Sequence, residues 1–178
     1  MDPVMDDRGE ASSSTERPLG PFFNLNVEND SFTGQVTYIY DGDTIKVTGQ
    51  SGDEDVRLLG INSPEVAHPK YGKLEGDPGG EEARLYIENM LLGKIVTVIY
   101  QRSAPRDHYG RILGIVFLGQ ACVNMDVMMR GHATPLLFDD NTIINAPEWL
   151  EFHRRAMRRM TAQSGLAKGS PQLEAIAS

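Results

Sequence analysis

The pattern of the fold is set by residues 35–48, which read QVTYIYDGDTIKVT. Two runs rich in β-branched and aromatic residues, 35–40 and 44–48, flank the turn sequence Asp41-Gly42-Asp43. This pattern predicts two antiparallel strands joined by a tight turn. A further turn at 49–53 and a β-rich run at 55–61 predict a third strand, so the first three strands form a meander.

The remaining elements are predicted from hydrophobic periodicity and from residues that begin or end helices. Beyond the meander we expect a helix over 81–92, strands over 95–100 and 111–118, and helices over 124–130 and 148–162. Residues 66–80 are rich in Gly and Pro and predict a long surface loop, a kind of segment that is often functional. Five strands with a helix between the third and the fourth fit an α+β, mainly β class, namely a five-stranded OB-fold barrel with three helices.

The chain of 178 residues is long enough for one ordinary core. We expect a disordered acidic N-terminal arm over 1–31, one domain over 32–165 and a C-terminal tail over 166–178. Such an arm is a candidate site for a protein partner, for example in a larger assembly such as a viral particle. Neither a membrane span nor a signal peptide is recognised, so we expect an intracellular, cytoplasmic protein with no membrane partner.

Charge and cysteine content exclude several classes of protein. The net charge is −8, yet residues 94–160 carry +3. Arg154, Arg155, Arg158 and Arg159 would share one positive helix face, which we interpret as a solvated surface. The single cysteine, Cys122, excludes an internal disulfide and a cysteine-based zinc site.

Three short motifs place polar residues at the predicted strand ends. They are Asp41-Gly42-Asp43-Thr44, then Arg57-Leu58-Leu59-Gly60-Ile61-Asn62-Ser63-Pro64-Glu65, then Asp107-His108-Tyr109-Gly110-Arg111. Together, and in this order of elements, they resemble the staphylococcal nuclease (thermonuclease) family over about residues 34–165. The first motif alone is an ordinary turn, whereas the combination is specific.

The resemblance implies a metal-dependent phosphodiester hydrolase that cleaves DNA, and RNA as a further candidate substrate, with low sequence specificity. In that family pattern Arg57, Glu65 and Arg111 are the catalytic residues, with Glu65 as general base and the arginines contacting phosphate. Calcium is the implied cofactor, with magnesium or manganese as alternatives, held by Asp43, Asn62 and the Ser63 carbonyl, with Asp41 nearby. His108, Tyr109 and Phe138 are the implied substrate-binding residues.

The sequence departs from the family pattern at the metal site and at the base-binding site. Asn62 stands where the pattern has a second carboxylate, so calcium affinity should fall or metal preference should shift. His108 replaces a lysine, and around 134–138 only Phe138 could stack on a base.

Each motif residue also has a structural interpretation. Asp41 and Asp43 could make turn hydrogen bonds, Arg57 and Glu65 could form a surface ion pair, and Arg111 could pair with Asp107. The alternative function is therefore a non-catalytic nuclease-like module that binds nucleic acid or supports an assembly.

Overall fold

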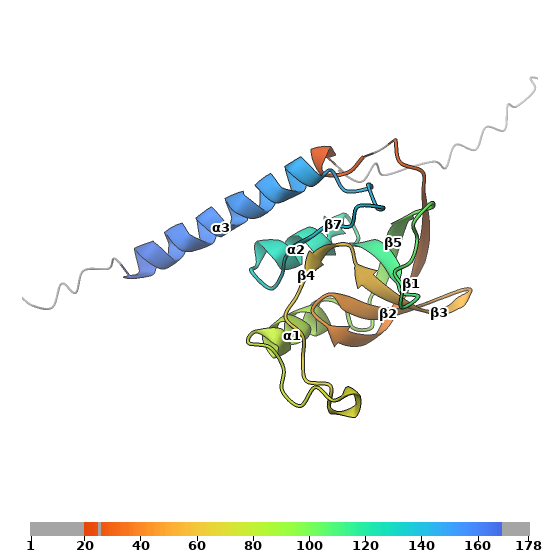
Figure 1. Cartoon of the computed structure of the whole chain (residues 1–178), viewed down its shortest axis with the longest axis horizontal. Helices are drawn as coiled ribbons and strands as arrows, with labels where there is room; N and C mark the ends of the chain where they lie inside the picture. Colours follow the sequence, from red (N-terminus) through yellow and green to blue (C-terminus); the bar gives the residue numbers. More distant parts are fainter. Residues whose placement is uncertain (1–19, 25, 169–178) are drawn as a thin grey trace, which may run out of the picture.

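The structure is a computed structural model that describes residues 20–24 and 26–168 (Figure 1). Its strands are β1 (Asn29–Asp41), β2 (Thr44–Gly49), β3 (Gly52–Leu58), β4 (Gly60–Asn62), β5 (Ile95–Gln101), β6 (Ile112–Leu118), β7 (Ala121–Cys122) and β8 (Thr134–Leu136). Its helices are α1 (Gly80–Leu91), α2 (Val123–Met129) and α3 (Ala146–Lys168), with short 3-10 turns η1 (Gly20–Phe22) and η2 (Pro69–Tyr71).

Five of the described strands close into a barrel. They follow the order β3-β2-β1-β5-β6, and parallel pairing of β3 with β6 closes the ring. β1 is long enough to pair with β2 through its second half and with β5 through its first half. The predicted five-stranded OB-fold barrel with three helices is confirmed for the part of the chain that the structure describes.

A β-bulge near the middle of β1 decides which side chains point outward. The pairing of β1 with β2 shifts register between Val36 and Tyr38, so the buried residues Val36 and Ile39 are three positions apart instead of two. A bulge inserts one extra residue into a strand, and beyond it the side chains again alternate between the inner and the outer side of the barrel. Tyr38 and Tyr40 therefore lie on the outer side of the barrel, and Tyr38 is 56% exposed.

Helix α3 is anchored at its N-terminal end and extends beyond the barrel at its C-terminal end (Figure 1). Trp149 is fully buried, and its indole Nε1 donates a hydrogen bond of 2.8 Å to the Gly60 carbonyl in β4. On the exposed part of α3, Glu151 forms ion pairs with Arg154, Arg155 and Arg158. This carboxylate lowers the positive charge of the arginine face.

The predicted start of the domain at residue 32 is too late. Phe23 is 7% exposed, lies 6.1 Å from Trp149 between ring centroids, and forms a β-bridge with Ile144. The Asn145 amide also donates to the Phe22 carbonyl at 2.8 Å. Aromatic packing thus adds residues 20–24 to the folded part. Residues 1–19 of the arm predicted over 1–31, and residues 169–178 of the tail predicted over 166–178, lie outside the described residues.

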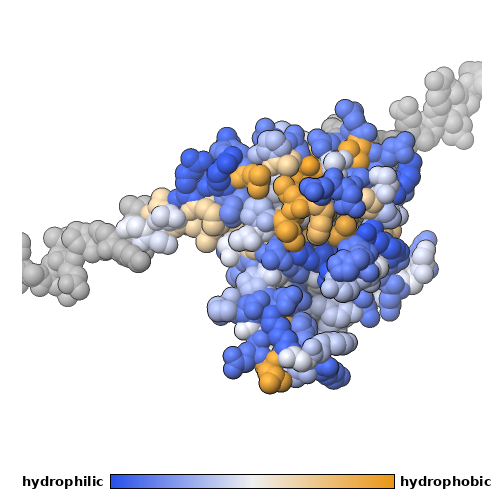
Figure 2. Space-filling model, in the orientation of Figure 1, coloured by the Kyte–Doolittle hydropathy of each residue, from blue (hydrophilic) through white to orange (hydrophobic). Residues whose placement is uncertain are grey.

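The segment between β4 and α1 projects from the barrel at the bottom of Figure 1 and is mostly hydrophilic in Figure 2. It contains η2 and corresponds to the loop predicted over 66–80. Among the described residues, no helix combines the length and the apolar character required to cross a membrane.

Candidate active site

The three polar motifs meet at one end of the barrel. Asp41 and Asp43 lie at the turn between β1 and β2, and Arg57 in β3 is paired with Thr44 in β2. The parallel contact of β3 with β6 brings Arg111, which directly precedes β6, to the same region. The barrel therefore gathers residues that are up to 70 positions apart in the sequence.

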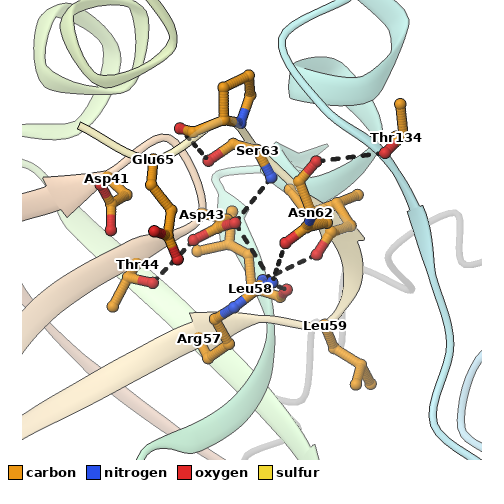
Figure 3. Close-up of polar contacts among 12 residues, drawn as sticks. Asp41, Asp43, Thr44, Arg57, Leu58, Leu59, Asn62, Ser63, Glu65 and Thr134 are labelled. Atoms are coloured by element: carbon orange, nitrogen blue, oxygen red, sulfur yellow. Dashed lines mark hydrogen bonds and ion pairs between the residues drawn. The ribbon is translucent and has the colours of Figure 1, made fainter. Parts of the chain in front are cut away.

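Asp43 is the buried acid of the site (Figure 3). It is 6% exposed, and its Oδ2 accepts a hydrogen bond of 2.7 Å from the Ser63 amide, while its Oδ1 accepts one of 2.9 Å from the Thr44 hydroxyl. The turn approaches closely because Gly42 has no side chain: a Cβ there would lie 2.6 Å from the Ala83 Cβ in α1. The predicted turn hydrogen bonds and the predicted site thus involve the same carboxylate.

Arg57 is buried beside Asp43, with Nη2 3.3 Å from Asp43 Oδ2. Its Nη1 donates to the carbonyls of Leu58 and Ile61 at 2.9 and 2.8 Å, and Nη2 donates to Asn62 Oδ1 at 3.1 Å. Burial lowers the pKa of the Arg57 guanidinium, and the Asp43 carboxylate partly offsets this effect. Arg57 therefore holds the β3-β4 connection in place and leaves fewer N–H groups for a phosphate.

Glu65 lies at the start of the projecting loop and is held there by two loop residues. Its Oε2 accepts from Lys73 Nζ at 2.7 Å, its amide donates to Asp77 Oδ2 at 3.0 Å, and its carbonyl accepts from the Asp77 amide at 2.8 Å. Lys73 also pairs with Asp77 Oδ1 at 3.1 Å. The hydrogen bond to Glu65 raises the pKa of Lys73. The pKa of Asp77 is lowered, mainly by the hydrogen bond from the Glu65 amide and then by the one from Lys73.

The start of α1 fixes the backbone of Glu65 from the other side. A Cβ on Gly80 would lie 2.3 Å from the Glu65 carbonyl oxygen, so only glycine allows this approach. Asp41 secures the next residue, since its Oδ1 accepts from the Val66 amide at 3.0 Å and lies 3.5 Å from His68 Nε2.

Arg111 is more accessible than Arg57. Its side chain is 30% exposed, its Nε donates to Asp107 Oδ2 at 2.8 Å, and its guanidinium carbon lies 5.1 Å from the centre of the Tyr109 ring. The predicted pairing with Asp107 is present, and it orients Arg111 at the wall of the site cavity.

A cavity of 410 Å³ contains part of the predicted site. Asp41, Glu65 and Arg111 line it, together with Thr44. An adjacent cavity of 310 Å³ is lined by Asn62 and Ser63, and Glu65 belongs to both cavities. The cavity linings place Glu65 at the boundary between the predicted phosphate contacts and two predicted metal ligands.

The predicted base-binding residues are not brought to this cavity. Phe138 is half-buried, packs against the core and lines neither cavity. His108 and Tyr109 stack on each other with ring centroids 3.9 Å apart, and Tyr109 is 73% exposed. Tyr109 is connected with the site through its contact with the Arg111 guanidinium.

Sequence reasoning missed five residues that line the 410 Å³ cavity. They are Tyr40, Asp55, His68, Tyr71 and Lys73. Three of them belong to the Gly- and Pro-rich loop that we expected to be functional, although the sequence offered no signal for which of its residues face the site.

The predicted metal ligands are oxygen atoms, the ligand type that a hard cation prefers. Asp43, Asn62 and the Ser63 carbonyl all offer oxygen, which calcium prefers. However, Arg57 Nη2 contacts oxygens of both Asp43 and Asn62, and among residues 20–24 and 26–168 no three His, Cys, Asp or Glu side chains are grouped as a metal site. We therefore expect weaker cation binding than two carboxylates would give.

Comparison with known proteins supports the motif assignment. A family model described as "Staphylococcal nuclease homologue" matches residues 55–161. Thermonuclease of Staphylococcus intermedius is 31% identical over 122 residues, which cover 68% of this chain and 70% of that protein.

Two further relatives match a similar region. An uncharacterized endonuclease of Escherichia coli is 33% identical over 109 residues, covering 61% of this chain and 63% of the relative. An uncharacterized protein of Bacillus anthracis is 33% identical over 128 residues, covering 71% of this chain but only 58% of the relative. Because the family model covers more than half of the chain and the thermonuclease match agrees with it, this chain belongs to the staphylococcal nuclease family.

Proposed function

We propose that this protein is a nuclease that hydrolyses phosphodiester bonds in DNA with low sequence specificity, and that RNA is its second substrate. Family membership supports a nuclease function in general. The observation that supports the proposal most is that Glu65 and Arg111 line the same cavity. The fold thus brings a carboxylate and a guanidinium together from distant parts of the sequence. The residues involved address phosphate, so they favour no particular base.

In this proposal Arg111 binds the scissile phosphate. Its Nε is engaged by Asp107, which fixes the plane of the guanidinium and directs the remaining N–H groups. A guanidinium in a fixed orientation can donate two parallel hydrogen bonds to phosphate oxygens, and it stabilises the charge that builds up as water attacks.

Glu65 is the proposed general base. Its carboxylate is 62% exposed, so water can reach it, while Lys73 restricts its orientation. The carboxylate accepts a proton from the attacking water, and the two backbone hydrogen bonds with Asp77 keep its position at the cavity boundary.

We further propose that Asp43, Asn62 and the Ser63 carbonyl hold a divalent cation, calcium in the first place. When bound, such a cation neutralises phosphate charge and favours ionisation of water. Asn62 would have to exchange its contact with Arg57 for this role, because Nη2 of Arg57 currently occupies its Oδ1.

The second candidate is a module that binds nucleic acid without cleaving it. It is favoured by that same Asn62-Arg57 contact, which satisfies the amide oxygen without a cation.

The test is incubation of the purified protein with plasmid and with single-stranded DNA and RNA in calcium, magnesium, manganese or chelator. Cleavage that needs a divalent cation supports the enzyme, and calcium should give the highest rate. Glu28→Gln serves as a surface control, since Glu28 lies outside both cavities and is 79% exposed. Binding without cleavage in every condition would instead establish the non-catalytic module.

A further inference from the structure

A large cavity lies beside the proposed active site, between the outer side of β1 and η2. Its volume is 860 Å³, and Tyr38 and Tyr40 line it from β1 while His68 and Tyr71 line it from the loop. Tyr40, His68 and Tyr71 also line the 410 Å³ cavity that contains Glu65 and Arg111. The two cavities are therefore adjacent and share these three side chains.

Two of the aromatic rings of this cavity are open to solvent, while Tyr40 and His68 are half-buried. Tyr38 is 56% exposed and Tyr71 is 88% exposed. The rings form two pairs, Tyr38 with Tyr40 at 4.8 Å and His68 with Tyr71 at 6.5 Å between centroids. Grouped exposed aromatic side chains mark binding surfaces more often than isolated ones do. The bulge in β1 places Tyr38 on this side, so the grouping follows from the backbone and from the sequence together.

Positive charge accompanies the rings. Lys46 Nζ lies 5.9 Å from the centre of the Tyr40 ring, and Lys70 is exposed and has no ion pair within the described part of the chain. Arg84 also lines the cavity, but its charge is balanced by Glu81 and Glu88. Lys46 also interacts with the Tyr40 hydroxyl and with Asp55, and Glu81 lines the same cavity, so Lys70 is the cation that remains available beside the aromatic rings.

Aromatic faces next to lysines suit one kind of ligand particularly well. Unpaired nucleobases stack on aromatic rings, and the phosphates between them are attracted by nearby cations. In a duplex the base faces are already stacked on each other and cannot reach a tyrosine ring. We infer that this cavity binds bases of a single-stranded nucleic acid, adjacent to the phosphate that Arg111 and Glu65 address.

This inference rests on the proposed function, and it deepens it by assigning a base-binding site to the β1 and η2 side of the cavity. It also accounts for base contacts that the other side of the site lacks, since Phe138 packs against the core. The bases would then contact the β1 and η2 side of the site.

The experiment measures binding by fluorescence anisotropy in chelator, so that no cleavage occurs. The probes are a labelled eight-residue thymidine oligonucleotide, the same length of abasic oligonucleotide, and a duplex. An abasic strand keeps its phosphates but has nothing to stack. We expect the parent protein to bind the thymidine strand about 5- to 100-fold more tightly than the abasic strand, from stacking of one or two bases.

Three variants test the assignment to these rings. Tyr38→Ala and Tyr71→Ala should each lose most of this preference, whereas Tyr71→Phe should keep it because stacking needs the ring and not the hydroxyl. Leu74→Ala is the matched control, since Leu74 is 78% exposed on the same loop but lines neither cavity. All three positions are on the surface, so the four variants should fold.

Two outcomes would overturn the inference: equal affinity of the parent protein for the thymidine and abasic strands, or unchanged preference in both alanine variants. Tighter binding of the duplex, with no effect of either alanine, would do the same and indicate phosphate contacts alone. The proposed nuclease function can fail independently of this inference. A protein that prefers the thymidine strand but cleaves nothing with any cation would keep the base site and lose the nuclease.

Hydrolysis of a small nitrophenyl phosphodiester gives a further check. Tyr38 does not line the 410 Å³ cavity, so Tyr38→Ala should hydrolyse this base-free substrate at the parent rate and lose rate only on oligonucleotides. An equal loss on both substrates would contradict a role in base binding.

Discussion

Arg57 and Arg111 carry the same charge but have different surroundings. Arg57 is 7% exposed and donates to two carbonyls of its own connection, while Arg111 is 30% exposed at the side chain and lines the cavity. Removing one partner of a buried ion pair leaves the other charge without compensation. Stability should therefore depend mainly on Arg57, and turnover on Arg111.

The first prediction compares the two alanine variants. Arg57→Ala should lower the free energy of unfolding by about 3–5 kcal/mol, because Asp43 stays buried without its partner. Arg111→Ala should change stability little but lower turnover about 10²–10³-fold, as loss of one transition-state donor does. Urea unfolding and DNA cleavage rates measure the two effects. Equal stability losses would show that Arg111 is structural.

The second prediction concerns Asn62. Asn62→Asp adds a carboxylate next to Asp43 and should tighten calcium binding on the order of tenfold or more, because affinity for this cation rises with the charge of its ligands. The measurement is a calorimetric calcium titration, with Asn29→Asp as a control that adds the same charge at the start of β1. An unchanged titration would place the cation elsewhere.

Part of the candidate site could be predicted from the sequence. The motif positions of Asp41, Asp43, Arg57 and Glu65 were predicted, and the structure brings them to one end of the barrel. The contacts of Glu65 with Lys73 and Asp77 were not predicted, because pairs inside a loop without periodicity depend on its three-dimensional path. The packing of Phe138 against the core was also not predicted, because it depends on the fold.

The loop between β4 and α1 is held by a small number of charged contacts. Lys73 joins Glu65 and Asp77 by two ion pairs, and Asp77 receives the Glu65 amide. All of these groups lie at the surface, so the loop should open more readily than the barrel does.

The third prediction follows from the lowered pKa of Asp77. A carboxyl whose pKa is lower in the folded state stabilises that state above its unfolded pKa, about 3.9, and this contribution is lost as pH falls through the folded value. The measurement is hydrogen exchange of the backbone amides, expressed as protection factors. The amides of Asp77 and Glu65 should lose protection below about pH 4, while the amide of Val98 in β5 should stay protected.

Asp77→Asn provides the comparison for that experiment, since it removes the charge and keeps the shape. The variant should show low protection of the loop already at pH 7. Protection factors that do not change between pH 7 and pH 3 in the parent protein would contradict the role of this carboxylate.

Most of the larger elements could be predicted and the smallest could not. The helix expected over 148–162 forms α3, which extends to Lys168, and β1 begins at Asn29 because its first half pairs with β5. β4 and β8 form a separate two-stranded sheet of three residues each. Segments of this length contain too few residues for a periodic pattern.

Helix α3 is connected directly to β4, the strand that carries Asn62. The Trp149 indole donates to the Gly60 carbonyl, and Gly60 is two residues from Asn62 in β4. The barrel, the helix and the predicted cation ligands thus form one packed unit.

The fourth prediction tests this connection. Trp149→Phe keeps most of the apolar contact but leaves the Gly60 carbonyl without its donor, which should cost about 1–3 kcal/mol of unfolding free energy. Phe152→Leu, which changes a neighbouring half-buried ring without a hydrogen bond, is the control in the same urea experiment. Equal stability of Trp149→Phe and the parent protein would show that the hydrogen bond contributes nothing.

The central claim is that Glu65 and Arg111 act on one phosphodiester in their shared cavity. Its most direct test is the turnover of a single-stranded oligonucleotide in calcium by the parent protein and Glu65→Gln, with Glu28→Gln as the control. Glu65→Gln should lower turnover about 10²–10⁴-fold, the contribution of a general base, with little change in oligonucleotide binding. Glu28→Gln should match the parent protein. Cleavage by Glu65→Gln at the parent rate would contradict the account, as would the absence of cleavage by the parent protein.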